Sequence, residues 1–152
     1  MTSDEALKRS LDRFLERVEL GLLLKWIQSV TGEQVYTLLL NVDFIPLIGD
    51  VQWSEITEFI FHLLISLIIG VVYVYLAKRR KYPFGQLVLI SLFLSVPFPF
   101  LYFLLSWLAV EADVPAATDW GAFLYWLFGH LTYALLLPIL YKTFERKNAV
   151  SQ

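Results

Sequence analysis

The chain has 152 residues, of which 58% are hydrophobic, and it carries a formal net charge of −2 and no cysteine. This apolar content exceeds the roughly 45–50% of average soluble domains, which favours lipid over water as the surrounding medium. The small net charge gives no support for a nucleic-acid partner. The lack of cysteine excludes disulfides, thiolate metal sites and cysteine nucleophiles.

Residues 1–53 are predicted to form an N-terminal amphipathic or interfacial region. From Leu7 to Leu22 apolar residues recur at three- and four-residue steps, which is the pattern of an amphipathic helix, and Ser3 with Asp4 can cap its start. We expect this helix to lie on the bilayer surface or on the rest of the bundle. A partner-binding or coiled-coil helix is the alternative.

Residues 20–48 have an ambiguous pattern. Two apolar stretches are separated by polar residues that include Lys25 and Glu33, and Asp43 interrupts the second stretch. A charged residue at mid-membrane costs about 2.5–3.5 kcal/mol on insertion scales, so a single straight span is disfavoured. We expect a helix that ends at Gly32, within an interfacial or re-entrant segment. A fourth, poorly apolar crossing is the alternative.

Three uncharged apolar runs follow, each close to the roughly 20 residues that a spanning helix needs. The predicted spans cover residues 55–77, 86–110 and 120–141, with Ser54 as the cap of the first, and together they form a transmembrane helical bundle over residues 54–152. The predicted fold class is therefore an all-α integral membrane protein. It has three transmembrane helices, an N-terminal amphipathic helix and a fourth, partial or re-entrant membrane segment.

Each span carries polar residues at three- and four-residue spacing, and such residues share one helix face. Polar faces turn away from lipid, so we expect the three faces to meet inside the bundle. The candidates for a polar intramembrane site are Glu58, His62, Ser66, Ser95, Tyr102, Trp126, His130 and Tyr133. Hydrogen-bonded contacts between helices are the simpler interpretation, and a functional cavity or pathway is the alternative.

His62 and His130 are the two histidines, and both lie within predicted spans. Three functional interpretations compete with a structural one. A b-type haem could use both imidazoles as axial ligands, although their depths along the helices differ by about 6 Å. A metal site could combine Glu58 with the two histidines. A proton or ion relay could use His, Tyr and Glu side chains. No cofactor is assigned from the sequence.

Pro97 and Pro99 lie near the middle of the second span and are hinge candidates. Each removes a backbone donor and clashes with the carbonyl four residues earlier, at Phe93 and Ser95, so the helix should kink or open there. Ser91 and Ser95 are placed where they could bond the freed carbonyls. A packing kink is the simpler interpretation, and a broken helix lining a substrate site is the alternative.

Basic residues follow the first and third spans, and the loop between the second and third spans is acidic. The first basic group is a lipid and topology anchor candidate made of Lys78, Arg79, Arg80 and Lys81. By the positive-inside rule, the loop of residues 78–85 and the C-terminus are predicted to be cytoplasmic, in a multi-pass protein of the cell membrane.

No phosphate-binding loop, nucleophile elbow or catalytic triad occurs in the sequence. We therefore predict a small, non-enzymatic accessory or structural membrane subunit whose partners are the lipid bilayer and either further copies of itself or a larger membrane protein. Two other functions stay open. One is a small oligomeric transporter or ion- or proton-translocating unit that uses the polar faces, and the other is a membrane haem or metal-binding protein.

Overall fold

The computed structural model describes residues 19–150, apart from the side chains of residues 144 and 147–150. The described part is all-helical, without strands, as predicted. Most of the amphipathic helix predicted from Ser3 lies outside the described residues. After a helix over residues 19–31, the elements are α2 (Val35–Leu40), α3 (Glu55–Lys78), α4 (Phe84–Ser95), α5 (Pro97–Leu108) and α6 (Trp120–Val150).

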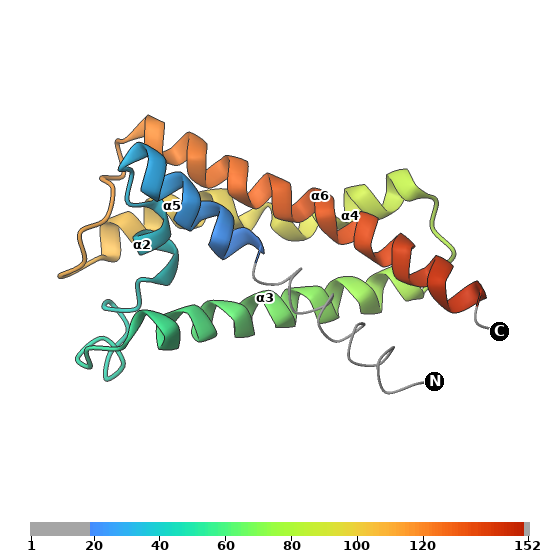
Figure 1. Cartoon of the computed structure of the whole chain (residues 1–152), viewed down its shortest axis with the longest axis horizontal. Coiled ribbons are helices and arrows are strands. Elements are labelled where there is room, and N and C mark those ends of the chain that lie inside the picture. Colours follow the sequence, from blue (N-terminus) through green and yellow to red (C-terminus); the bar gives the residue numbers. More distant parts are fainter. Residues whose placement is uncertain (1–18, 151–152) are drawn as a thin grey trace.

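Within residues 19–150, three helices are long and apolar enough to span a membrane, which confirms the predicted number. They are Glu55–Lys78, Phe84–Leu108 and Trp120–Thr143. Figure 1 shows α6 packed along α4 and α5, with α3 diverging from them. The α3–α4 loop and the last turns of α6 lie at one end of the bundle, called here the basic end. The loops before α3 and before α6 lie at the opposite, acidic end.

The first span begins where the sequence predicts it. The Ser54 side chain caps α3 by accepting a hydrogen bond from the amide of Thr57. Glu55 and Glu58 lie in the first turn and Lys78 lies in the last, an arrangement that complements the helix dipole.

The second span is broken, as the two prolines predict. Helix α4 ends at Ser95 and α5 begins at Pro97, with Val96 between them donating only a long bond of 3.4 Å to the carbonyl of Phe93. Pro97 and Pro99 have no amide hydrogen, so they cannot continue the helical bonding pattern of α4.

The helix over residues 19–31 packs against two spans through glycines. A Cβ added to Gly129 of α6 would come within 2.8 Å of the Leu24 side chain, and one added to Gly21 would come within 2.3 Å of Phe59 on α3. Small residues of this kind allow helices to approach closely inside membranes. In Figure 1 this helix runs antiparallel to the first half of α6.

The polar side chain of Gln28 joins the helix over residues 19–31 to α2. The helix ends before Gly32, as predicted, because Gly32 takes a positive φ of 81°. The Gln28 amide oxygen then accepts bonds from the backbone amides of Tyr36 and Thr37, at 2.9 and 3.0 Å. These amides belong to the first turn of α2, so Gln28 caps that helix from outside.

Lys25 lies at the acidic end of the bundle, beside the start of α3. Its ammonium pairs with the Glu55 carboxylate at 2.5 Å, and both side chains are more than half exposed. The Tyr36 hydroxyl donates to the same carboxylate at 3.0 Å. Burial, followed by the bond to Glu55, raises the pKa of Tyr36 above its ordinary value. This tie links residues 19–40 to the start of α3.

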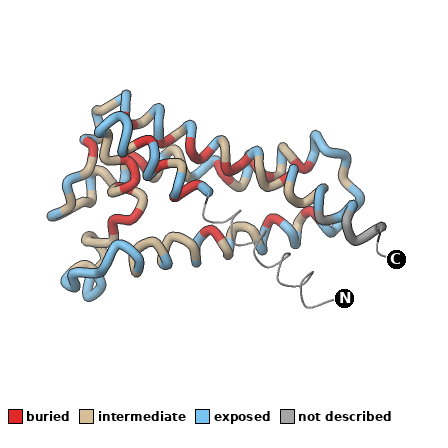
Figure 2. Tube along the Cα trace, in the orientation of Figure 1, coloured by how far each residue is buried: buried red, intermediate tan, exposed pale blue. Residues whose placement is uncertain are grey.

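The main core lies at the acidic half of the bundle, where residues 19–40 share one apolar cluster with α5 and α6. Its largest fully buried side chains are those of Leu24, Leu38, Tyr102 and Trp126. A smaller cluster of Tyr73, Ala77 and Leu87 joins α3 to α4 near the basic end. Figure 2 shows the buried positions concentrated in the main core and sparse along α3.

Asp43 ties the loop before α3 to the loop after α5. One carboxylate oxygen accepts hydrogen bonds from three successive amides, those of Val110, Glu111 and Ala112, at 3.1, 2.8 and 2.8 Å. The Asn41 side chain donates to the other oxygen at 2.9 Å. Partial burial acts to raise the pKa of Asp43, but these bonds outweigh it and hold that pKa below 3.8, its ordinary value.

The same loop requires a glycine at position 49. A Cβ on Gly49 would lie 2.0 Å from the backbone oxygen of Asp43, far inside contact distance. The loop also holds Leu47 at a positive φ of 70°, which is uncommon for a residue with a side chain. The turn that presents Asp43 is therefore tightly constrained.

Replacing Asp43 by Asn should destabilise the folded protein by about 1 kcal/mol, because three amides exchange a charged acceptor for a neutral one at a partly exposed site. The folded-state pKa is lowered, so the stabilising effect is present above pH 3.8 and is lost as pH falls through the lower folded pKa. Thermal unfolding in detergent at several pH values measures this. The Asp50→Asn variant is the control, and equal losses in both variants would contradict the role of Asp43.

Replacing Gly49 by Ala should cost about 1–3 kcal/mol, since the added methyl meets backbone atoms of Asp43 that cannot rotate away. Gly70→Ala is the matched control, because nothing lies within 4 Å of a Cβ at that helical position. The control should keep or raise the melting temperature. A Gly49→Ala protein that melts with the wild type would show that the loop relaxes freely.

Candidate functional site

Most of the polar side chains predicted to face the bundle interior are buried. The buried candidates are Ser66, Ser95, Tyr102, Trp126, His130 and Tyr133, and Ser91 is buried with them. Helices α3, α4, α5 and α6 all contribute to this set, and its hydrogen bonds run mainly from side chains to backbone carbonyls. We call this set the polar seam.

His130 is held by its own helix and by two aromatic rings. Its Nδ1 lies 2.8 Å from the carbonyl oxygen of Trp126, one turn earlier on α6. Because a carbonyl can only accept, Nδ1 carries the proton and Nε2 of the neutral ring is an acceptor. The imidazole also lies 4.4 Å from the Trp126 ring and 5.7 Å from the Phe98 ring, measured between centroids.

Trp126 bridges the broken second span to α6. Its indole donates a hydrogen bond of 2.9 Å to the carbonyl of Phe98, which lies in the first turn of α5. Trp126 and Phe98 therefore hold each other as well as His130. This contact fixes α5 against α6 just beyond the break.

His62, Ser66 and Tyr133 connect α3 to α6. The Nε2 of His62 lies 3.3 Å from the Ser66 hydroxyl, one turn later on α3. The Tyr133 hydroxyl of α6 donates to the backbone oxygen of Ser66 at 3.2 Å. His62 also lies within electrostatic reach of His130. The structure thus brings the two histidines into one region, with Ser66 and Tyr133 beside them.

Ser91 bonds a carbonyl freed by a proline, but that proline is on another helix. Its hydroxyl donates to the backbone oxygen of Ala134 in α6, at 2.5 Å, and both residues are fully buried. Pro138 lies four residues after Ala134 and has no amide hydrogen to donate to that oxygen. The expectation that Ser91 bonds a carbonyl of its own span is wrong. The signal that could have revealed this pairing was Pro138 itself.

Ser95, unlike Ser91, bonds no freed carbonyl. Its hydroxyl is buried and has no hydrogen-bond partner among the described residues. It lies one turn after Ser91, and His130 lies one turn before Ala134. Since α4 and α6 run antiparallel, the Ser91–Ala134 bond places Ser95 and His130 at the same level. Ser95 also lies at the helix break, where Pro99 leaves its backbone oxygen without the usual donor.

Tyr102 lies outside the histidine region. Its hydroxyl donates to the backbone oxygens of Ala116 and Asp119, at 3.0 and 2.9 Å, which fixes the loop before α6. Its ring packs edge-on to the ring of Trp126, with 6.1 Å between the centroids. Tyr102 therefore links the polar seam to the acidic end.

Glu58 does not belong to the polar seam. It lies within electrostatic reach of Glu55 and Asp43, at the acidic end. No group of three His, Asp or Glu side chains placed to hold a metal ion occurs in the described part of the chain, so Glu58, His62 and His130 form no such group. Each imidazole keeps a second nitrogen, so its hydrogen bond does not test the haem prediction.

The anchor residues Lys78, Arg79, Arg80 and Lys81 are all exposed at the basic end. Arg79 donates to the Tyr75 hydroxyl at 2.6 Å. Gln28 and Asp43, which organise the acidic end, were not predicted as functional residues. The partners of Asp43 lie 67 to 69 positions away, and those of Gln28 lie beyond the turn at Gly32, so helical spacing reveals neither.

Ser91→Ala should cost about 1 kcal/mol, because the Ala134 carbonyl loses its hydroxyl donor inside the bundle. In a Pro138→Ala background the backbone amide of residue 138 can donate to that oxygen, so the same substitution should cost much less. Denaturant unfolding of the four proteins gives the coupling energy. Thr132→Ala is a control, since its hydroxyl bonds a carbonyl within an unbroken turn. Equal Ser91→Ala costs in both backgrounds would refute the pairing.

The seam can therefore join helices, and it holds an imidazole acceptor, His130, at the same level as the buried Ser95 hydroxyl. A scan against protein-family models, a search of curated proteins and a search of solved structures each found no match to this chain.

Proposed function

We propose that the chain is a non-enzymatic structural or accessory subunit of the cytoplasmic membrane. One observation carries this proposal. Most polar side chains of the polar seam bond backbone carbonyls of the same bundle, as in the bonds from Ser91, Trp126 and Tyr133. Groups used in this way join helices and are not offered to a substrate.

Assembly with further copies, or with a larger membrane protein, is the second part of the proposal. Helix α3 is the least buried of the three spans. Its outer face carries exposed apolar residues at three- and four-residue spacing, namely Leu64, Ile68, Val71 and Tyr75. A protein neighbour on this face would supply the contacts that α3 lacks within one chain.

The orientation we propose places the basic end in the cytoplasm. The loop of residues 78–81 and the α6 residues Lys142 and Arg146 lie at that end, whereas Asp43, Glu55 and the loop before α6 lie at the other. The positive-inside rule favours this arrangement.

A small ion- or proton-translocating unit is the second candidate. The observation that favours it is the buried Ser95 hydroxyl, which has no partner in the described part of the chain and lies at a helix break, level with His130. Broken helices that expose carbonyls beside ionisable groups are used by transporters to bind ions.

Photo-cross-linking tests the proposed assembly. A photoreactive residue at Ile68 of α3, in native membranes, should give a discrete cross-linked product. The same residue at Phe93 of α4, which is also highly exposed, should give little. Equal yields at the two positions would mean random collisions in the bilayer and would contradict assembly through α3.

Flux measurements in liposomes separate the two candidates. The structural proposal expects wild-type protein to pass protons and monovalent cations no faster than empty liposomes. Flux that is lost in Ser95→Ala and His130→Ala, and kept in Ser106→Ala, would overturn it in favour of translocation. Ser106 is a matched control because its hydroxyl is also buried without a partner among the described residues, away from the break.

A further inference from the structure

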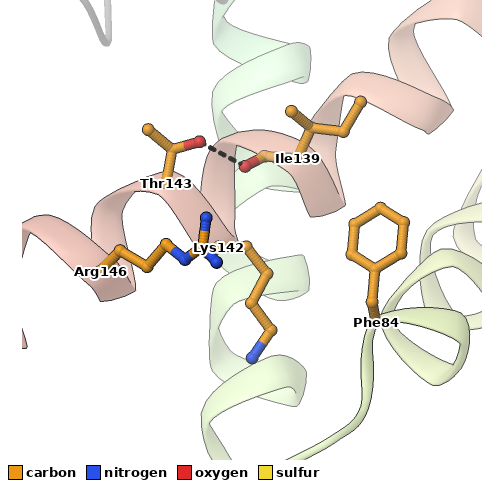
Figure 3. A pocket seen from close by; sticks show the side chains of 5 residues that line it. All are labelled: Phe84, Ile139, Lys142, Thr143 and Arg146. Carbon is orange, nitrogen blue, oxygen red and sulfur yellow. Dashed lines mark hydrogen bonds between the residues drawn. The ribbon is translucent and has the colours of Figure 1, made fainter.

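A partly open pocket of about 420 Å³ lies between α4 and α6 at the basic end of the bundle. Figure 3 shows its lining, which consists of Phe84, Ile139, Lys142, Thr143 and Arg146. The volume falls within the roughly 300–1,000 Å³ of pockets that hold small ligands. The polar seam does not contribute to this pocket.

The pocket lies where the apolar run of α6 gives way to charged residues. Ile139 belongs to the last turn of the apolar run of α6, and Lys142 is the first formally charged residue of that helix. Arg146 follows one turn later. Phe84 begins α4 directly after the basic loop. The lining therefore has an apolar part toward the membrane and a cationic part toward water.

The positive charges of Lys142 and Arg146 are only partly balanced by carboxylates of the described residues. Lys142 pairs with the Glu145 carboxylate at 2.6 Å. No carboxylate among the described residues pairs with Arg146. The Thr143 hydroxyl donates to the Ile139 carbonyl at 2.8 Å. Lys142 and Arg146 are one turn apart on α6, where like charges repel, so an anion between them would relieve that repulsion.

We infer that this pocket binds an anionic phospholipid. The phosphate lies with Lys142 and Arg146, and an acyl chain runs past Ile139 and Phe84. A guanidinium matches a phosphate through paired hydrogen bonds, and basic pockets between transmembrane helices suit such headgroups. A soluble phosphate would leave the apolar half of the lining without a contact. The inference stands independently of the proposed assembly.

Binding of short-chain phosphatidylglycerol to the full-length protein in neutral detergent tests the inference. Native mass spectrometry and thermal shift should show saturable binding, with phosphatidylcholine much weaker. The Lys142→Gln/Arg146→Gln variant should weaken binding about 25-fold, since each basic residue near a lipid surface contributes roughly a fivefold factor. The Arg80→Gln/Lys81→Gln variant removes one Arg and one Lys from the same end, outside the pocket, and should change binding less than about threefold.

Two single variants sharpen the test. Glu145→Gln removes the carboxylate that competes for Lys142 and should tighten phosphatidylglycerol binding several-fold, a gain that misfolding cannot imitate. Phe84→Ala should weaken lipid binding while leaving any displacement by inorganic phosphate unchanged.

Three results would overturn the inference. Equal losses in the two double variants would mean a diffuse charge effect of the basic end. Equal binding of phosphatidylcholine would mean that the headgroup charge is not recognised. Full displacement by inorganic phosphate, with no effect of Phe84→Ala, would mean a site for a free anion.

Discussion

The shortage of hydrogen-bond partners in hydrocarbon governs this bundle. Pro97, Pro99 and Pro138 each remove a backbone donor from a span, and lipid cannot replace it. At Pro138 the bundle supplies a hydroxyl from the neighbouring helix, Ser91, which brings α4 and α6 into close contact. At the other two prolines the helix breaks into α4 and α5, and the Trp126 indole bonds a carbonyl beside the break. A hydrogen bond between two helices therefore lies at or near each of these prolines.

The two ends of the bundle are organised differently. At the acidic end the Asp43 carboxylate accepts bonds from three amides of a distant loop. Gln28 joins the helix over residues 19–31 to α2, and the pair of Lys25 with Glu55 joins that helix to α3. The charges of Asp43, Lys25 and Glu55 are thus paired or hydrogen-bonded within the protein. At the basic end the loop of residues 78–81 is exposed and Arg146 has no carboxylate partner among the described residues. That end is therefore suited to contacts with anionic groups from outside.

The same hydrogen bonds bear on function. A polar group that already bonds a backbone carbonyl must break that bond before it can serve a substrate, so the seam favours a structural role. Ser95 is the exception, because its buried hydroxyl has no partner among the described residues at the level of His130. If the bundle moves ions, that level is where a path would form. The contrast between Ser91 and Ser95, one turn apart, separates the two proposals.

The sequence alone determined the helical class, the three spans, the Ser54 cap, the helix end at Gly32 and the break at Pro97. These depend on local composition, length and backbone chemistry. The tertiary structure decided which groups meet. Asp43 finds its amides 67 to 69 positions later, and Ser91 finds a carbonyl 43 positions away. Periodicity places a residue on a helix face but does not say which neighbour that face contacts, because packing between distant segments sets the register.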